Sequence, residues 1–336
     1  MLQDARVLQE DYVPEAVEAR NAELNELSRA LDPVEENEQA ENVLLYGPSG
    51  TGKTFLAKFM LEELNEELPG VHTQYVDCWR NYSRFDCLYE VLNGIASTTD
   101  IHRESTPTGE ILNRIEEYEG PPNGRPYVVI LDEADQLEDK KVLYDLYNVN
   151  GLSMILIANE REEFFTSLGQ RLLSRLRTCR QIELGSYSLS ALVEILDSRA
   201  ELALGPDAVD RRQLETIADI AAGDARQAIA ILRTAAREAD RKGSEITDEI
   251  IKEVVPEAMK DLQRKRVGML KDHQRVLYEI LKEHGELEPG ELYGRYSERV
   301  DEPRSDRTVR NYLNKLEHYD LVVGEGEKRG RTYKPK

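Results

Sequence analysis

A glycine-rich turn between an apolar run and an amphipathic run is the feature that most constrains the fold of this chain. The turn follows the run VLLY, precedes FLAKF and has the pattern G-x-x-x-x-G-K-T. Glycines in such a turn let successive backbone N–H groups point inward around phosphate oxygens, and the N-terminus of the following helix adds its positive dipole end. The sequence therefore predicts a phosphate-binding loop made of Gly47, Pro48, Ser49, Gly50, Thr51, Gly52, Lys53 and Thr54.

Two acidic residues follow a later apolar run. In YVVILDEADQL, Asp132 and Glu133 come where a buried strand would end, at the edge where open α/β sheets bind ligands. We expect Lys53 to neutralise the terminal phosphates of ATP, and Thr54 and Asp132 to hold Mg²⁺, Asp132 through water. Glu133 is expected to polarise the attacking water. The alternative is an acidic surface turn, and the glycine-rich loop argues against it.

Further polar residues are placed to act on a bound nucleotide. The run SMILIANE ends on Asn159, whose amide either orients the attacking water and reports the terminal phosphate or merely closes a turn. In SLGQRLLSRLRT, Arg171 and Arg175 share one helical face. Each is a candidate arginine finger for a neighbouring subunit, and a solvated ion pair is the alternative for each. In GDARQAI, Arg226 lies in the first turn of a predicted helix, where it would fold back onto the nucleotide.

The alternation of short apolar runs with helical stretches over residues 42–184 predicts an α/β fold with a parallel sheet covered on both faces. The predicted strands are VLLYG, TQYVDC, YVVILDE and SMILIANE, and a helix is predicted over residues 15–31. Amphipathic helices then predict a helical lid. A charged connector, MKDLQRKRVGM, precedes a terminal unit in which LVVG and RTYK predict a hairpin. We place the three domains at residues 1–184, 185–258 and 265–336.

The charge of the chain is strongly acidic and unevenly distributed. It carries 65 acidic and 44 basic side chains, a net charge of −21, which by itself argues against a nucleic-acid partner. Residues 260–336, however, hold 18 basic and 15 acidic side chains, whereas residues 1–259 hold 26 and 50. We therefore expect a protein of a high-salt cytoplasm whose terminal unit retains the capacity to bind DNA.

Membrane and metal patterns are not found in the sequence. No apolar run approaches the roughly 20 residues of a membrane helix, and the first residues lack the blocks of a secretion signal, so we expect a cytoplasmic protein. The spacing of Cys78, Cys87 and Cys179 fits no zinc or redox pattern. We interpret these cysteines as packing residues.

The last residues predict a DNA-reading helix and a basic hairpin loop. Ser305 is placed to cap a helix in which Val309, Leu313 and Leu316 face inward. Arginine and asparagine on the outer face would read base edges in a major groove, and the loop cations would lie beside phosphates. A domain used only for protein docking is the alternative. The expected DNA-binding residues are Arg307, Arg310, Asn311, Asn314 and Lys315 on the helix and Lys328, Arg329 and Arg331 in the loop.

The order of these motifs resembles the AAA+ superfamily, and the details resemble the archaeal replication initiators related to the eukaryotic origin recognition complex. DYVPEAVEARNAELNEL is similar to that family's tyrosine-proline lead-in to the first helix. VDCWRNYSRFDCLYEVLNGIA followed by STPTGEIL is similar to its initiator-specific insertion, here about residues 79–105. LYDLYNVN, GDARQAIAILRTAAREA and a terminal winged helix continue the match over nearly the whole chain. The loop and acidic pair are specific only to the superfamily, whereas the insertion, the GDAR helix and the winged helix together are specific to the initiators.

The resemblance implies an ATP-dependent protein that binds double-stranded origin DNA and initiates chromosome replication, with slow ATP hydrolysis as a switch. It implies ATP or ADP and Mg²⁺ as cofactors, a replicative helicase as a partner, self-association on DNA and a place at the nucleoid. It assigns phosphate and Mg²⁺ to Lys53 and Thr54, the acidic pair to Asp132 and Glu133, the first sensor to Asn159 and the second sensor to Arg226.

The resemblance leaves the arginine finger and the role of the insertion open. The initiators' Arg-Val-x-Ser-Ser pattern would select Arg171, which we favour, whereas RLLSRL also resembles the Ser-Arg finger of clamp loaders, which selects Arg175. In the family the insertion contacts the DNA minor groove, and an ordinary helical hairpin is the alternative here. The cations available in it are Arg80, Arg84, His102 and Arg103.

Two other functions fit parts of the sequence. One is a clamp-loader ATPase subunit, which the terminal winged helix argues against because clamp loaders end in a helical collar. The other is a transcriptional regulator whose nucleotide domain serves only as a ligand sensor.

Overall fold

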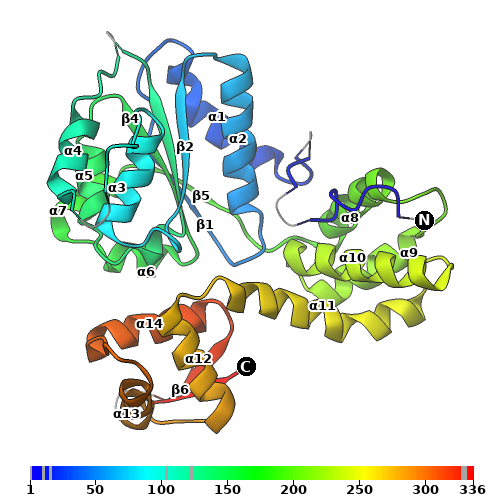
Figure 1. Cartoon of the computed structure of the whole chain (residues 1–336). Coiled ribbons are helices and arrows are strands. Elements are labelled where there is room, and N and C mark those ends of the chain that lie inside the picture. Colours follow the sequence, from blue (N-terminus) through cyan, green and yellow to red (C-terminus); the bar gives the residue numbers. More distant parts are fainter. Residues whose placement is uncertain (1, 10–11, 15–16, 103–104, 122–123, 327–330) are drawn as a thin grey trace. The chain divides into compact units, whose positions relative to one another are not determined.

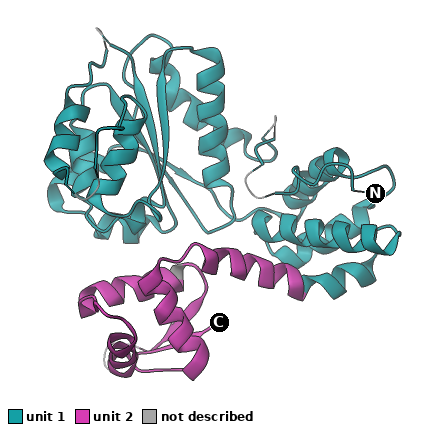
Figure 2. Ribbon diagram, viewed as in Figure 1, with its two compact units in different colours: residues 1–255 teal, residues 256–336 magenta. Residues whose placement is uncertain are grey.

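The computed structural model describes residues 2–9, 12–14, 17–102, 105–121, 124–326 and 331–336. The chain forms two compact units, residues 1–255 and residues 256–336 (Figure 2). The boundary falls inside one helix, α11 (Asp248–Gly268), which includes all of the charged connector except its last residue, Met269. The connector is therefore helical. Among the described residues, none of the helices is long and apolar enough to cross a membrane.

The first unit is built on a parallel sheet. Over the described residues the sheet has five strands in the order β2-β3-β4-β1-β5, all parallel. The α/β prediction and the four predicted strands are confirmed. The sequence pattern misses β5, because this edge strand reads RQIE and only its Ile182 is buried. The strands are β1 (Val43–Tyr46), β2 (His72–Asp77), β3 (Tyr127–Asp132), β4 (Leu152–Ala158) and β5 (Arg180–Glu183).

Helices cover both faces of this sheet (Figure 1). Val43 and Leu45 of β1 pack with α1 and α2, whereas Leu44 between them packs with the helices of the other face. This alternation follows from the two-residue period of a strand. One face carries α1 (Asn21–Leu31), η1 (Asp32–Val34) and α2 (Lys53–Glu67). The other carries α3 (Arg84–Asn93), α4 (Thr108–Glu116), η2 (Ala134–Gln136), α5 (Lys141–Tyr147), α6 (Arg161–Thr166) and α7 (Gln170–Leu176).

The first helix begins at Asn21, so the helix predicted over residues 15–31 is too long. Ala19 has a φ of 58°, and Arg20 has a non-helical backbone with φ −134° and ψ 26°. The guanidinium of Arg20 donates to the backbone carbonyls of Thr51 (3.2 Å) and Gly185. These tertiary contacts override the local helical propensity of the segment.

A helical lid follows the sheet, as predicted. It consists of α8 (Leu189–Ala203), α9 (Arg211–Ala221), α10 (Ala225–Lys242) and the first part of α11. Asp210 begins α9 with a capping box, and Gly243 ends α10 in the left-handed conformation.

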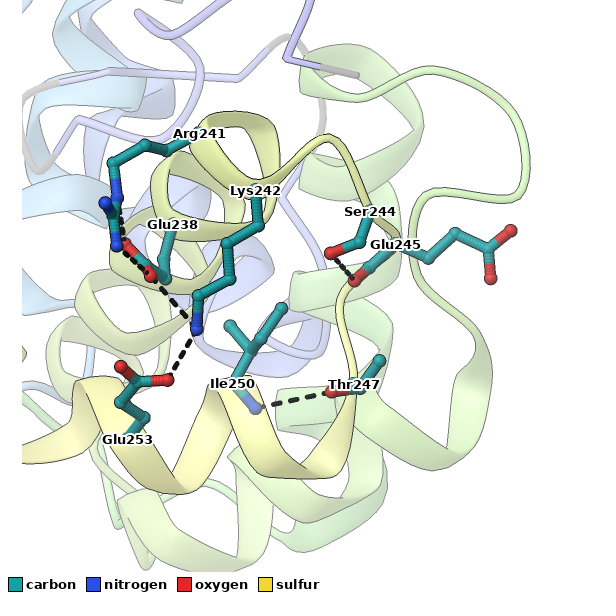
Figure 3. A network of polar contacts seen from close by, with 8 residues as sticks. All are labelled: Glu238, Arg241, Lys242, Ser244, Glu245, Thr247, Ile250 and Glu253. Carbon is teal, nitrogen blue, oxygen red and sulfur yellow. Dashed lines mark hydrogen bonds and ion pairs between the residues drawn. The ribbon is translucent and has the colours of Figure 1, made fainter.

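An ion-pair network joins α10 to α11 (Figure 3). The carboxylate of Glu238 accepts two hydrogen bonds from Arg241 (2.8 and 2.6 Å) and pairs with Lys242 (3.1 Å). These cations hold the pKa of Glu238 at about 2. Lys242 also donates to Glu253 of α11 (2.6 Å), so the first turns of α11 are fastened to the lid.

The N-terminal segment packs on the lid through Arg199 of α8. The Arg199 guanidinium is 7% exposed and donates to the backbone carbonyls of Val7, Gln9 (3.3 Å) and Tyr12 (3.1 Å). It also lies 5.1 Å from the centre of the Tyr12 ring. One buried cation therefore satisfies several backbone carbonyls of this segment.

The second unit is a winged helix, as predicted. It consists of α12 (Asp272–His284), α13 (Pro289–Arg299), α14 (Asp306–His318) and an antiparallel hairpin of β6 (Val322–Glu325) and β7 (Thr332–Pro335). A β-bridge between Leu287 and Tyr333 ties the segment before α13 to the hairpin. Ser305 caps α14 by accepting a hydrogen bond from the Thr308 N–H (3.3 Å).

We expect Arg199→Met to lower the free energy of unfolding by about 2–3 kcal/mol, because buried carbonyls lose their donors. The N-terminal segment should also detach, which tryptic cleavage after Arg6 would report. Arg212→Met is the matched control, because Arg212 is 79% exposed in a loose ion pair with Asp248 (3.6 Å). This variant should change neither the free energy of unfolding nor the cleavage after Arg6. Equal stability of Arg199→Met and the wild type would contradict this account.

Candidate nucleotide site and nucleic-acid interface

The predicted phosphate-binding loop joins the end of β1 to the start of α2. Gly50 and Gly52 have φ of 78° and 89°, a region that other residues rarely adopt. A Cβ on Gly50 would lie 2.1 Å from Asp224 Oδ1, and a Cβ on Gly52 would lie 2.5 Å from the Tyr187 hydroxyl. Both glycines are therefore required by the shape of the loop and by the close approach of the segments leading into the lid.

The remaining loop residues are held by backbone contacts. Thr51 is buried and donates its hydroxyl to the Pro48 carbonyl (2.9 Å). The Gly47 N–H donates to the Asn159 carbonyl (3.2 Å), which fixes the loop to the end of β4. Pro48 and Ser49 are exposed at the tip of the loop.

The ammonium of Lys53 is buried inside this loop, with Lys53 only 7% exposed. Its Nζ donates to Gly47 O (2.6 Å), Pro48 O (2.7 Å) and Asn159 Oδ1 (2.9 Å). Loss of hydration on burial lowers the pKa of Lys53 to about 8. These three acceptors are uncharged, and the nearby carboxylate of Asp132 offsets the loss of hydration only in part, so an anionic ligand such as phosphate is favoured. The structure thus brings together Lys53 and Asn159, each of which the sequence analysis expects to act on a bound nucleotide.

Asp132 and Thr54 also lie together. Asp132 is 6% exposed at the end of β3, and its Oδ2 accepts hydrogen bonds from Thr54 Oγ1 (2.8 Å) and the Tyr75 hydroxyl (2.8 Å). Burial raises the pKa of Asp132, and the two hydroxyl donors oppose this rise. A hydroxyl and a carboxylate are oxygen ligands of the kind that Mg²⁺ prefers, together with phosphate oxygens and water, so this donor set fits the ion. Elsewhere among the described residues, no cluster of three or more His, Cys, Asp or Glu forms a metal cage.

Glu133 begins a strained turn directly after Asp132. Its φ of 55° and ψ of 45° are left-handed, which is uncommon for a residue other than glycine and is often found at functional sites. The turn continues as η2, and the half-buried ammonium of Lys140 donates to the carbonyls of Asp135 (2.7 Å) and Leu137 (2.7 Å) at its end. Lys140 therefore braces the turn that carries Glu133.

The lid contacts the phosphate-binding loop directly. The Ala225 N–H, at the start of α10, donates to the Gly50 carbonyl (3.1 Å). Asp224 caps the same helix by accepting from the Gln227 N–H (3.0 Å). Arg226 lies in the first turn, as predicted, and its positive charge contributes to the lowered pKa of Lys53. Two cations and the positive end of α10 thus converge on the loop, an arrangement suited to phosphate.

Arg20 is a residue of this site that the sequence analysis missed. Its buried guanidinium donates to the Thr51 carbonyl of the loop (3.2 Å), pairs with Glu23 (2.7 Å) and lies 4.1 Å from the centre of the Tyr187 ring. The Tyr187 N–H donates in turn to Gly223 O of the lid (3.1 Å). Arg20 thus joins the N-terminal segment, the loop and the segment before the lid. The local sequence carries no signal for this role, because the partners are backbone carbonyls distant along the chain.

The two candidate finger arginines of α7 differ in their surroundings. Arg175 lies 5.0 Å from the centre of the Tyr144 ring and 5.6 Å from that of Tyr147, and it donates to the Arg171 carbonyl (3.1 Å). Arg171 is exposed, and within the described part of the chain its side chain makes no ion pair. Arg175 therefore has a packing role in this chain, whereas Arg171 is available to a ligand outside it.

The outer face of α14 carries exposed Arg307, Arg310, Asn311 and Asn314, as predicted. The prediction for Lys315 is wrong, because Lys315 is 7% exposed. At about 100° of rotation per residue, Lys315 lies about 90° from the centre of the exposed face and about 60° from buried Tyr312. Tyr312 widens the buried stripe of the helix beyond the predicted Val309, Leu313 and Leu316 and towards Lys315, which is buried on the flank of the helix next to that stripe.

The hairpin loop is only partly described. Lys328 and Arg329 lie outside the described residues. Arg331 pairs with both carboxylate oxygens of Glu317 on α14 (2.8 and 2.7 Å) and lies 5.2 Å from the centre of the Tyr333 ring. Its charge is thus partly compensated within the domain, and a phosphate would compete with Glu317 for it.

The insertion presents fewer free cations than the sequence suggests. Trp79 is buried, and Arg84 of α3 pairs with the buried carboxylate of Asp145 (2.7 Å). Arg80 is 68% exposed in a loose pair with Asp77 (3.4 Å), and His102 is exposed. Arg103 lies outside the described residues. Arg84 therefore joins α3 to α5 and is not available at the surface.

Comparison with known proteins identifies the family. Residues 36–165 match the AAA domain family, and residues 193–260 match the Cdc6 AAA+ ATPase-type lid domain. ORC1-type DNA replication protein 9 of Halobacterium salinarum is 45% identical over 99% of this chain and 93% of its own length. ORC1-type DNA replication protein 1 of the same organism is 47% identical over 93% of this chain and all of its own. This chain belongs to the ORC1-type DNA replication proteins. The halobacterial relatives also confirm the expected halophilic character.

The structural likeness of this ORC1-type protein extends over nearly its whole length. The Aeropyrum pernix ORC1 protein, solved in complex with DNA, is 27% identical with a TM-score of 0.76, covering 99% of this chain and 92% of that one. The Aeropyrum pernix ORC2 protein, solved with ADPNP and ADP, is 24% identical with a TM-score of 0.64 over 99% of this chain and 94% of that one, and it shows the shared fold. Membership of the AAA+ ATPases implies that this ORC1-type protein binds and hydrolyses ATP.

The lowered pKa of Lys53 predicts a pH dependence of nucleotide binding. The nucleotide-free chain loses the Lys53 proton near pH 8, and bound phosphates favour the charged form, so binding raises this pKa and takes up a proton. We expect proton uptake near zero at about pH 7, rising towards one at about pH 9, with affinity falling as the pH rises. The number of protons taken up is measured by calorimetry of ADP binding in buffers of different ionisation enthalpy.

Lys140 provides the control, because burial also lowers its pKa to about 8 while its contacts are to the η2 turn. Lys140→Met should retain the uptake. Loss of the uptake in that variant, or its absence from the wild type at about pH 9, would contradict the assignment to Lys53.

Proposed function

We propose that this protein recognises double-stranded DNA at a replication origin and initiates chromosome replication, with ATP bound at the loop and slow hydrolysis acting as a switch. The observation that carries the proposal is the direct contact between the phosphate-binding loop and the lid, the hydrogen bond from the Ala225 N–H to the Gly50 carbonyl (3.1 Å). A ligand that changes the loop must also change this contact, so nucleotide state and lid position are linked.

Each nucleotide-site residue has a defined part in this proposal. Lys53 and Arg226 supply positive charge to the phosphates, and Asn159, held by the Lys53 ammonium (2.9 Å), orients the attacking water. Glu133 polarises that water from its braced turn. Thr54 and Asp132 would hold Mg²⁺, which when bound neutralises charge on the phosphates. The cost of keeping Glu133 strained and Lys53 buried is consistent with a site organised for a bound state.

The DNA-binding part of the proposal rests on the terminal domain. Its α14 exposes two arginines and two asparagines on one face, a set suited to bidentate contacts with guanine and adenine in a major groove. The Aeropyrum pernix ORC1 protein, which is similar over nearly the whole chain, was solved in complex with DNA. In a strongly acidic protein of a halophilic type, base contacts, shape and water should supply more of the affinity than phosphate neutralisation.

Further parts of the proposal concern partners and boundaries. We propose that the protein self-associates on DNA, with Arg171 as the finger to a neighbour's nucleotide, and that it acts with a replicative helicase at the nucleoid. The proposed domains are residues 1–184, 185–258 and 265–336; the first ends next to β5, which ends at Glu183, and the boundaries at 258 and 265 lie within α11. The clamp-loader alternative loses its support, because ORC1-type relatives match over nearly the whole chain.

Arg171→Ala should lower ATP hydrolysis of the DNA-assembled protein by at least about 10-fold, because a finger stabilises charge in the transition state. ADP affinity and stability should not change, since Arg171 is exposed. Arg175→Ala should instead lower the free energy of unfolding by about 1 kcal/mol through lost contacts with two tyrosine rings. Loss of hydrolysis in Arg175→Ala at unchanged stability, with Arg171→Ala active, would transfer the finger to Arg175.

Arg310→Ala and Asn314→Ala should each weaken binding to duplex fragments selected from the native genome by about 5- to 150-fold, which corresponds to ~1–3 kcal/mol for a lost base contact. Fluorescence anisotropy measures this, and both variants should unfold at the wild-type temperature. Arg299→Ala is the charge-matched control, because Arg299 lies on α13 and pairs with Glu283 (2.7 Å). Equal weakening by Arg299→Ala would indicate a general charge effect and contradict recognition by the α14 face.

A further inference from the structure

Tyr75 donates its hydroxyl hydrogen to Oδ2 of Asp132 at 2.8 Å, the same oxygen that accepts the Thr54 hydroxyl at 2.8 Å. Tyr75 lies on β2, an edge strand of the sheet, and has no part in the roles assigned above. The carboxylate expected to hold the metal ion is thus fixed from two sides by hydroxyl groups on different elements, α2 and β2.

The strand register explains how Tyr75 contacts Asp132. Tyr75 pairs with Ile130, and Asp132 lies two residues further along β3 on the same face. Such diagonal neighbours on adjacent strands are within reach of a long side chain such as that of tyrosine. The residue paired directly with Asp132 is Asp77, whose negative charge raises the pKa of Asp132. Asp77 therefore cannot replace Tyr75 as a donor to this carboxylate.

The Tyr75 side chain is itself held in place. Its ring packs with the apolar cluster between the sheet and α2, and the Lys58 ammonium lies 4.0 Å from the ring centre. Burial and the neighbouring Asp132 raise the pKa of Tyr75, so the hydroxyl keeps its proton. An ionised carboxylate only accepts hydrogen bonds, so the hydroxyl acts as the donor.

We propose that Tyr75 is a positioning residue for Asp132 in the binding of Mg²⁺-nucleotide. The inference rests on the proposed function, in which Thr54 and Asp132 hold the ion. The single hydroxyl group of Thr54 is expected both to bind the ion and to donate to the Asp132 carboxylate. Tyr75 is a second donor that does not bind the ion, so it keeps Asp132 oriented when the Thr54 hydroxyl moves to bind the ion. Donors to a metal-binding carboxylate commonly contribute about 10–100-fold to metal affinity or activity.

The test compares Tyr75→Phe with Tyr127→Phe. Phenylalanine retains the ring beside Lys58 and removes only the hydroxyl. Tyr127 is the matched control, because it is a fully buried tyrosine on the neighbouring strand whose hydroxyl donates to the Val91 carbonyl (2.5 Å), away from Asp132. The affinity for a fluorescent ADP analogue is measured for each full-length protein in MgCl₂ and in EDTA, with thermal unfolding recorded alongside.

We expect Tyr75→Phe to bind the analogue in EDTA like the wild type, while the gain in affinity on adding Mg²⁺ falls by about 10-fold or more. Tyr127→Phe should keep the full gain, even where its unfolding temperature falls as much. An unchanged gain in Tyr75→Phe, or an equal loss in both variants, would overturn the role of Tyr75. A wild-type chain whose affinity does not respond to Mg²⁺ would overturn the proposed metal site itself, and the role of Tyr75 with it.

Discussion

The buried ammonium of Lys53 is the constraint on which the nucleotide site depends. An ionised amine with little exposure must have all its hydrogen bonds satisfied. Its acceptors are the Gly47 and Pro48 carbonyls of the loop and the Asn159 side chain at the end of β4. This requirement holds the loop against the end of β4, the strand that pairs with β1. It also places a positive charge that is only partly compensated where phosphate is expected, at the edge of the sheet where β1 and β4 end.

The lid extends this constraint to the rest of the first unit. Gly50 contacts both Asp224 and Ala225 at the start of α10, and Arg20 joins the loop to the segment that precedes the lid. Helix α10 is in turn fastened to α11 by Lys242 and Glu253, and α11 continues into the winged helix. A covalent and hydrogen-bonded path therefore runs from the phosphate-binding loop to the helix that carries the terminal domain.

The sequence predicts those parts whose signal is local. Strands β3 and β4 are buried on both faces and appear as apolar runs, and the loop residues appear as a motif. Edge strand β5, with only Ile182 buried, carries no such signal. Tyr75 and Arg20 could not be predicted, because their roles depend on strand register and on carbonyls distant along the chain. Lys315 was misplaced because it lies on the flank of α14, next to buried Tyr312, where the apolar pattern of the sequence does not show whether a side chain is covered.

The most direct test of the account is a genome-wide footprint of the tagged protein in its native cells, compared with that of Lys53→Ala, which removes the buried ammonium. We predict peaks at replication origins that weaken or change in the variant, because nucleotide state and the lid are linked through the loop. Peaks spread over promoters would contradict this and favour a transcriptional regulator. Identical origin peaks for both proteins would show that DNA recognition does not depend on the nucleotide.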